Sequence, residues 1–149
     1  MKQYPYLRAY LAGIAVPTCF MLVVLAAFCI ARFVYRVPIP IERAIVFPMA
    51  LIPNIFGAWN MLYVALGPRH QLPLGFHGAI LPLILAPLGA RLATLLGFLT
   101  PVDHGFVWFQ AVRIEYAHFV LLFPFALAVY YLVWKYLVGF LNGMLGIAA

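Results

Sequence analysis

A glutamate and a histidine three residues apart form the most suggestive chemical pattern in this chain. Glu115 and His118 would project from one face of a helix, because residues three apart lie on the same side of it. Glu-x-x-His is a ligand spacing of carboxylate-bridged di-iron bundles, which need two such motifs and two further glutamates. This chain has one motif, so Glu115 and His118, even joined by Asp103 and His104, could supply only a mononuclear metal site. We favour the simpler interpretation, an interfacial pair of Arg113 and Glu115 beside a histidine at the level of the lipid headgroups.

Haem would require two histidines at a similar depth on facing helices. His77 and His118 begin the third and fourth apolar runs, and consecutive membrane spans run antiparallel. The two starts would therefore lie on opposite membrane faces, about 30 Å apart, and could not ligate one iron within one chain. His104 and His118 could do so at one surface, but no other feature indicates haem. We predict no cofactor, neither haem nor metal, and expect lipid at the protein surface.

Arg91 is the most unusual charge, because it lies inside the third apolar run. It precedes the predicted end of that run by about eight residues, or about 12 Å of helical rise. A charge at that depth is costly unless it reaches the headgroups, pairs with an acid, or faces a water-filled cavity. We favour snorkelling or pairing with Glu115 or Glu42. The alternative is a functional role in binding an anionic headgroup or substrate.

Asn54 and Asn60 lie inside the second apolar run. They are six residues apart and therefore do not share a helix face. Each amide could bond a neighbouring helix or the backbone carbonyls that Pro48 and Pro53 leave free. Packing between helices is the simpler interpretation of both asparagines, and a polar pocket shared with Arg91 is the sharper alternative.

The other charged residues gather at the ends of apolar runs. Glu42, Arg43, Arg113 and Glu115 are predicted to form an interfacial charge cluster. If the chain crosses the membrane four times, all three acidic residues, including Asp103, lie on the face that carries the first and third loops. This asymmetry depends only on the number of spans.

The composition excludes an ordinary soluble domain. The 149 residues are 68% hydrophobic and 8% charged, whereas a soluble domain is about 25% charged. The net charge of +6 comes from basic residues scattered singly near the ends of apolar runs, which is typical of anchoring at lipid headgroups rather than nucleic-acid binding. A Gly-rich phosphate loop, a Gly-x-Ser-x-Gly elbow and a Cys-x-x-Cys pair are all missing from the sequence. The thin catalytic inventory favours a non-catalytic role, although it leaves an enzyme open.

Four apolar runs account for nearly the whole chain, and each is long enough for the roughly 20 residues of a membrane span. We predict an all-α integral membrane protein: a four-transmembrane-helix bundle with short loops, in which prolines kink the second and third helices. Small residues between Ala86 and Gly97 would permit close approach of another helix to the third span. A single transmembrane domain, residues 1–149, is predicted, with spans at about 7–33, 44–66, 74–99 and 114–140 and an interfacial loop or short flat helix at 100–111.

The first apolar run is predicted to remain in the mature protein. Its apolar stretch, Ala9 to Ala31, is too long for the hydrophobic region of a cleaved signal peptide. Four spans place both termini on one face of the membrane. The basic residues are nearly balanced between the faces, and the arginines of the first loop favour a cytoplasmic first loop and non-cytoplasmic termini.

Three functions remain open on the sequence alone. The leading hypothesis is a non-catalytic structural or accessory subunit of a membrane complex or homo-oligomer, whose partners are membrane lipids and itself or other membrane subunits, without nucleic acid. The second is an oligomeric small-molecule or lipid transporter or channel that uses Arg91 and the broken helices. The third is a membrane enzyme with an interfacial Glu/His/Asp site that acts on a lipid-borne substrate.

Overall fold

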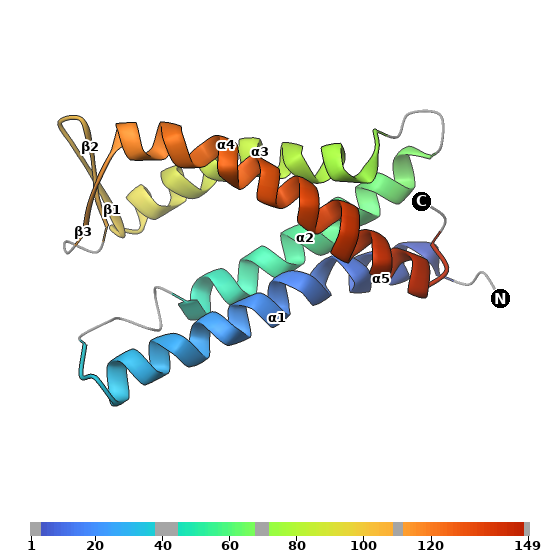
Figure 1. Ribbon diagram of the computed structural model, residues 1–149, viewed down its shortest axis with the longest axis horizontal. Helices are drawn as coiled ribbons and strands as arrows, with labels where there is room; N and C mark the ends of the chain where they lie inside the picture. Colours follow the sequence, from blue (N-terminus) through green and yellow to red (C-terminus); the bar gives the residue numbers. More distant parts are fainter. Residues whose placement is uncertain (1–3, 38–44, 68–71, 109–111, 148–149) are drawn as a thin grey trace. The chain divides into compact units, whose positions relative to one another are not determined.

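A computed structural model describes residues 4–37, 45–67, 72–108 and 112–147 of the chain. The chain divides into two compact units: unit 1, residues 1–71 and 137–149, and unit 2, residues 72–136. Among the described residues, four helices are long and apolar enough to cross a membrane (Figure 1). They are Pro5–Phe33, Pro48–Leu66, Leu74–Leu95 and Tyr116–Met144. Helix length and composition thus indicate a multi-pass α-helical membrane protein, as predicted.

Unit 1 consists of α1 (Pro5–Phe33), α2 (Phe47–Leu66) and the short α5 (Gly139–Met144). Helices α1 and α2 pack along each other, and α5 contacts α1. Pro17 and Pro53 lie inside α1 and α2. Membrane helices tolerate such prolines because neighbouring helices and hydroxyl or amide side chains can satisfy the freed backbone groups.

Unit 2 consists of α3 (Leu74–Leu95), a small sheet, and α4 (Tyr116–Leu132), which packs against α3 on its return (Figure 1). A π-helical turn, η2 (Val133–Val138), continues α4 into α5. Such turns are rare and occur mostly as single insertions within α-helices.

The sheet was not anticipated from the sequence. It is a three-stranded antiparallel meander of β1 (Leu99–Val102), β2 (Gly105–Trp108) and β3 (Val112–Glu115). The prediction of a loop or flat helix at 100–111 is therefore wrong for the described residues of that segment. The strands also take residues that the sequence analysis had assigned to the ends of the third and fourth spans. A positive φ of 72° at Gly97 ends the helical path, and β-branched and aromatic residues then favour extended backbone.

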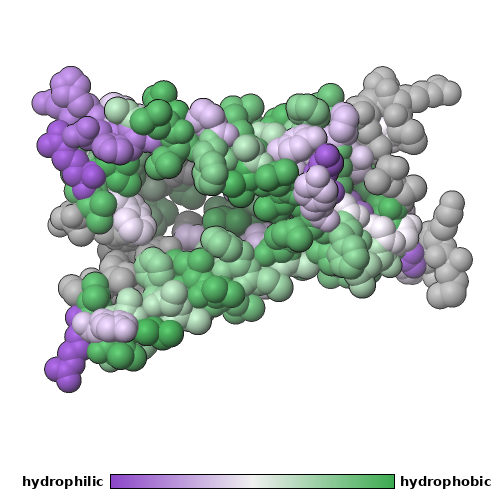
Figure 2. Space-filling view, in the orientation of Figure 1, coloured by the Kyte–Doolittle hydropathy of each residue, from purple (hydrophilic) through white to green (hydrophobic). Residues whose placement is uncertain are grey.

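Hydrophobic side chains cover the helices of each unit, and hydrophilic residues gather at the helix ends (Figure 2). One group of hydrophilic residues lies over the strands of unit 2, and another lies beyond the carboxyl end of α1 in unit 1. Helix α4 has no buried residue at all. A helix that is apolar all round is stable only in an apolar environment, so this surface fits lipid or another membrane helix.

Candidate functional site

The most deeply buried amides of unit 1 are the side chains of Asn60 on α2 and Asn142 on α5, both fully inaccessible to solvent. Asn60 Nδ2 donates hydrogen bonds to Asn142 Oδ1 at 2.8 Å and to the backbone carbonyl of Ala9 on α1 at 2.7 Å. Asn142 Nδ2 donates in return to Asn60 Oδ1 at 3.2 Å. This cluster, which we call the amide cluster, links all three helices of unit 1.

Close approach of α1 and α2 brings the amide cluster together. A Cβ atom on Gly13 would lie only 2.6 Å from the carbonyl oxygen of Phe56 and 2.8 Å from the Cα of Gly57. The backbone of α1 at Gly13 therefore lies directly against the backbone of α2 at Phe56 and Gly57. Small residues permit this type of contact between membrane helices, and here it places Asn60 within reach of Ala9.

Asn54 has a different environment from Asn60. Its side chain is exposed, accepts a hydrogen bond from the Tyr10 hydroxyl of α1, and donates from Nδ2 to the carbonyl of Ala50 at 2.6 Å. The two asparagines thus serve separate contacts between α1 and α2. Both contacts fit their interpretation as packing groups.

Asn142 was not predicted as a packing residue, because the fourth predicted span ended at about residue 140. A signal was present, because Asn142 is one of only three asparagines and is isolated within an apolar stretch. A polar side chain in such a stretch requires a partner if it enters the membrane. Arg8 gives α5 a second link to α1, because its Nη1 donates to the carbonyl of Leu145 at the end of α5, at 3.4 Å. A cation at a helix carboxyl end also interacts favourably with the helix dipole.

Arg91 is exposed on α3 and forms no hydrogen bond or ion pair with the part of the chain that the structure describes. Because α3 ends at Leu95, Arg91 lies four residues, or about 6 Å of rise, from the helix end. Its side chain can reach the headgroups from there without a protein partner. Pairing with Glu115 does not occur in the structure, and Glu42 and Arg43 lie outside the described residues.

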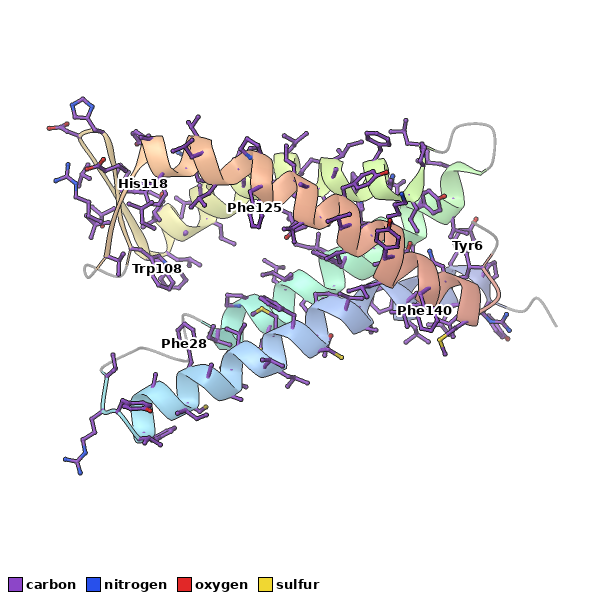
Figure 3. All side chains as sticks on the ribbon, viewed as in Figure 1. Tyr6, Phe28, Trp108, His118, Phe125 and Phe140 are labelled. Carbon is purple, nitrogen blue, oxygen red and sulfur yellow. The ribbon has the colours of Figure 1, made fainter. Side chains whose placement is uncertain are left out.

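The predicted acid and histidine residues share one end of unit 2. Asp103 and His104 form the turn between β1 and β2, where His104 has a positive φ of 64°. The His104 carbonyl accepts a 3.0 Å hydrogen bond from the Tyr116 amide, so the turn adjoins the start of α4. Glu115 ends β3, and His118 lies in the first turn of α4 (Figure 3). The side chains of all four predicted candidates are exposed.

These four residues lie at the same end of unit 2, but their arrangement is not that of a metal centre. Within the described ranges, no three His, Cys, Asp or Glu side chains are close enough to hold a metal ion. Arg113 was predicted to pair with Glu115, but its Nη2 donates instead to the backbone carbonyl of Asp103, at 3.2 Å. Arg113 therefore braces the β1–β2 turn from β3.

Unit 2 has its own close helix contact, between α3 and η2. A Cβ on Gly78 would overlap the indole of Trp134, which is fully buried. The His77 ring is also buried and meets that indole edge to face, with ring centroids 5.9 Å apart. Small residues between Ala86 and Gly97 were predicted to permit close approach of another helix to this span. Gly89, within that range, has no atom of the described chain within 4 Å of where a Cβ would stand. The close contact within this chain therefore lies at the opposite end of α3, and approach of another helix between Ala86 and Gly97 stays a prediction.

These contacts define a class: a small multi-pass helical membrane protein in which buried amides and glycine contacts hold the helices together. No protein-family model, curated protein or solved structure matches the chain. Its function is therefore inferred from its own residues.

Proposed function

We propose that this protein is a non-catalytic structural or accessory subunit that packs in the membrane against copies of itself or other subunits. The amide cluster carries the proposal. Both N–H groups of Asn60 are donated within unit 1, one to Asn142 and one to Ala9. A polar group used in this way stabilises a helix assembly and leaves no amide hydrogen of Asn60 for a substrate.

The outer surface of α4 supports the same proposal. Val120, Leu121 and Phe125 are 68%, 76% and 68% exposed, and no residue of α4 is buried. Another membrane helix lying there would gain van der Waals contact without any loss of hydrogen bonds. We therefore place the partner of this subunit on α4.

The test is the composition of the particle released from native membranes by a mild detergent. We expect a mass well above the 16.7 kDa of one chain, with further copies or distinct polypeptides present in fixed ratio. A single chain that carries only a bound small molecule or pigment would contradict the proposal.

A matched pair of variants locates the contact. Leu121→Ala with Phe125→Ala removes large side chains from α4, and Phe20→Ala with Val23→Ala removes similarly exposed side chains from α1. We expect the α4 variant to release the partner and the α1 variant to retain it, with equal thermal midpoints for the two chains. Retention of the partner by both variants would place the contact away from α4.

One observation favours a carrier as the second candidate. Arg91 is an exposed cation near the end of α3, and it makes no ion pair with the described residues. A carrier of anionic lipids or metabolites would use such a group. In that case the isolated protein would retain an anionic molecule, and Arg91→Gln would release it whereas Arg91→Lys would not.

A further inference from the structure

The three-stranded sheet has one entirely apolar face. Residues directly opposite on adjacent strands project from the same face, and successive residues along a strand alternate between faces. The observed register pairs Trp108 with Leu99 on one side and with Val112 on the other. The apolar face of the sheet comprises Leu99, Pro101, Phe106, Trp108, Val112 and Ile114.

The opposite face is mixed and contains charges. This polar face comprises Thr100, Val102, Gly105, Val107, Arg113 and Glu115. All six residues of the apolar face are half-buried or exposed, so much of that face is open to its surroundings. A sheet of this kind fits a boundary between an apolar and an aqueous phase.

The sheet lies where such a boundary is expected. Strand β1 begins four residues after the end of α3, and α4 begins directly after β3. Helix α3 has 22 residues, or about 33 Å of rise, which matches a hydrocarbon layer about 30 Å thick. If α3 crosses that layer, the sheet begins at the level of the lipid headgroups.

The direction of the strands indicates how the sheet meets the lipid. Figure 1 shows the strands running across the axes of α3 and α4 rather than extending them. A strand of four residues is about 13 Å long, whereas the headgroup layer is about 5–8 Å deep on each side. A sheet that lies flat therefore remains within this layer, whereas an upright sheet would carry its apolar face into water.

We propose that the sheet is an interfacial anchor whose apolar face lies on the membrane lipid and whose polar face points to water. Trp108 and Phe106 supply the aromatic rings that favour the membrane interface. Arg113, on the polar face, lies at the level of the lipid phosphates. This inference depends on the membrane spans and is independent of the proposed accessory-subunit role.

The experiment measures the depth of Trp108 in the bilayer. Trp59→Phe with Trp134→Phe leaves Trp108 as the only tryptophan. The protein is reconstituted into phosphatidylcholine vesicles whose acyl chains carry bromine either near the headgroup or near the bilayer centre. We expect several-fold stronger fluorescence quenching by the shallow bromines than by the deep ones, and weak quenching by aqueous acrylamide.

Three other outcomes would overturn the proposal. Strong acrylamide quenching without bromolipid quenching would place the apolar face in water. Quenching by neither agent would mean that protein covers the face, either a second copy or another subunit. The deep bromines would dominate if Trp108 were inserted as part of a span, which would also contradict a flat anchor.

A second measurement, cysteine labelling, keeps the buried Trp134 in place. With the two natural cysteines replaced by alanine, Thr100→Cys reports on the polar face and Val112→Cys on the apolar face. Both positions are exposed in the protein. In lipid vesicles open to the reagent on both sides, a water-soluble maleimide should label Thr100→Cys several-fold faster than Val112→Cys, and denaturation should equalise the rates. Equal labelling before denaturation would refute the proposed orientation.

Discussion

At the scale of single residues, the polar groups described inside unit 1 act mainly on other parts of the same unit. Asn60 binds Asn142 and Ala9, and Asn54 accepts from Tyr10. Lipid offers no alternative hydrogen-bond partner, so loss of one member leaves the other amide unsatisfied in an apolar environment. The same residue types that could have formed a polar pocket instead form contacts between helices.

Asn60→Ala should therefore destabilise the protein, and the loss should depend on Asn142. We expect each single alanine variant to lower the free energy of unfolding by about 1–2 kcal/mol, in the range known for hydrogen bonds between membrane helices. The double variant should cost less than the sum, because the second substitution removes a group that has already lost its partner. Unfolding in mixed micelles measures the free energy of unfolding of the unsubstituted protein, the two single variants and the double variant.

Asn54→Ala is the control for this cycle. Asn54 is exposed and bonds Tyr10 and its own helix, so its substitution should be additive with Asn142→Ala. Strict additivity of Asn60→Ala with Asn142→Ala would instead show that the amide cluster does not form.

Gly13→Ala should be costly although it adds only one methyl group. That methyl would overlap the backbone of α2 at Phe56 and Gly57, which cannot rotate away as a side chain could. We expect a loss of about 1–3 kcal/mol, typical of overpacking. Gly89→Ala is the matched control: its surroundings are open, and alanine should stabilise that helix by up to about 1 kcal/mol. Equal thermal midpoints for the two variants would contradict the contact between α1 and α2.

At the scale of elements, hydropathy predicted the four long helices and failed at the sheet. Apolar residues from Leu74 to Leu99 form one continuous run, in which the end of a span has no compositional mark. The chain turns at Gly97, because that glycine adopts a positive φ. Four-residue strands are too short for their alternation to stand out inside an apolar run. The spacing of Glu115 and His118 predicted a common helix face only if both residues lie on one helix. In the structure Glu115 belongs to β3 and only His118 belongs to α4.

The contact between α3 and η2 gives a prediction at this scale. Gly78→Ala should destabilise unit 2 by about 3 kcal/mol, because the new methyl would occupy the space of the Trp134 indole. Trp134→Leu should restore part of that loss in the double variant, since a smaller side chain frees room for the methyl. Thermal unfolding in detergent would measure both effects.

Gly143→Ala serves as the control for Gly78→Ala. Gly143 is also helical, but no atom lies within 4 Å of where its Cβ would stand. The Gly143→Ala substitution should therefore leave the stability unchanged. A Gly78→Ala chain as stable as the Gly143→Ala chain would show that Trp134 does not pack on Gly78.

At the scale of the whole molecule, composition predicted the class of protein, whereas local sequence did not predict the contacts between distant parts of the chain. The hydrophobic fraction and the number of apolar runs led to a multi-pass membrane protein, which the four long helices support. The amide cluster could not be predicted, because it joins residues 51 and 82 positions apart and hydropathy carries no information about such pairing. The isolation of Asn142 in an apolar stretch indicated that it needs a partner, but the sequence did not show that Asn60 and Ala9 would supply the contacts or that Arg8 would bond the end of α5.

The number of spans makes a prediction about the whole chain. Four crossings require both termini on one side of the membrane, and the segments after α1 and after α3 on the other. In a chain without its natural cysteines, Tyr35→Cys and His104→Cys should be labelled from the same side, because both side chains are exposed beyond the ends of helices. Epitopes added at the two termini should be accessible only from the opposite side, which the arginines of the first loop place away from the cytoplasm. Labelling of Tyr35→Cys and His104→Cys from opposite sides would mean that one of the two helices between them, α2 or α3, does not cross. A common side that faced away from the cytoplasm would preserve the four spans and reverse only the orientation.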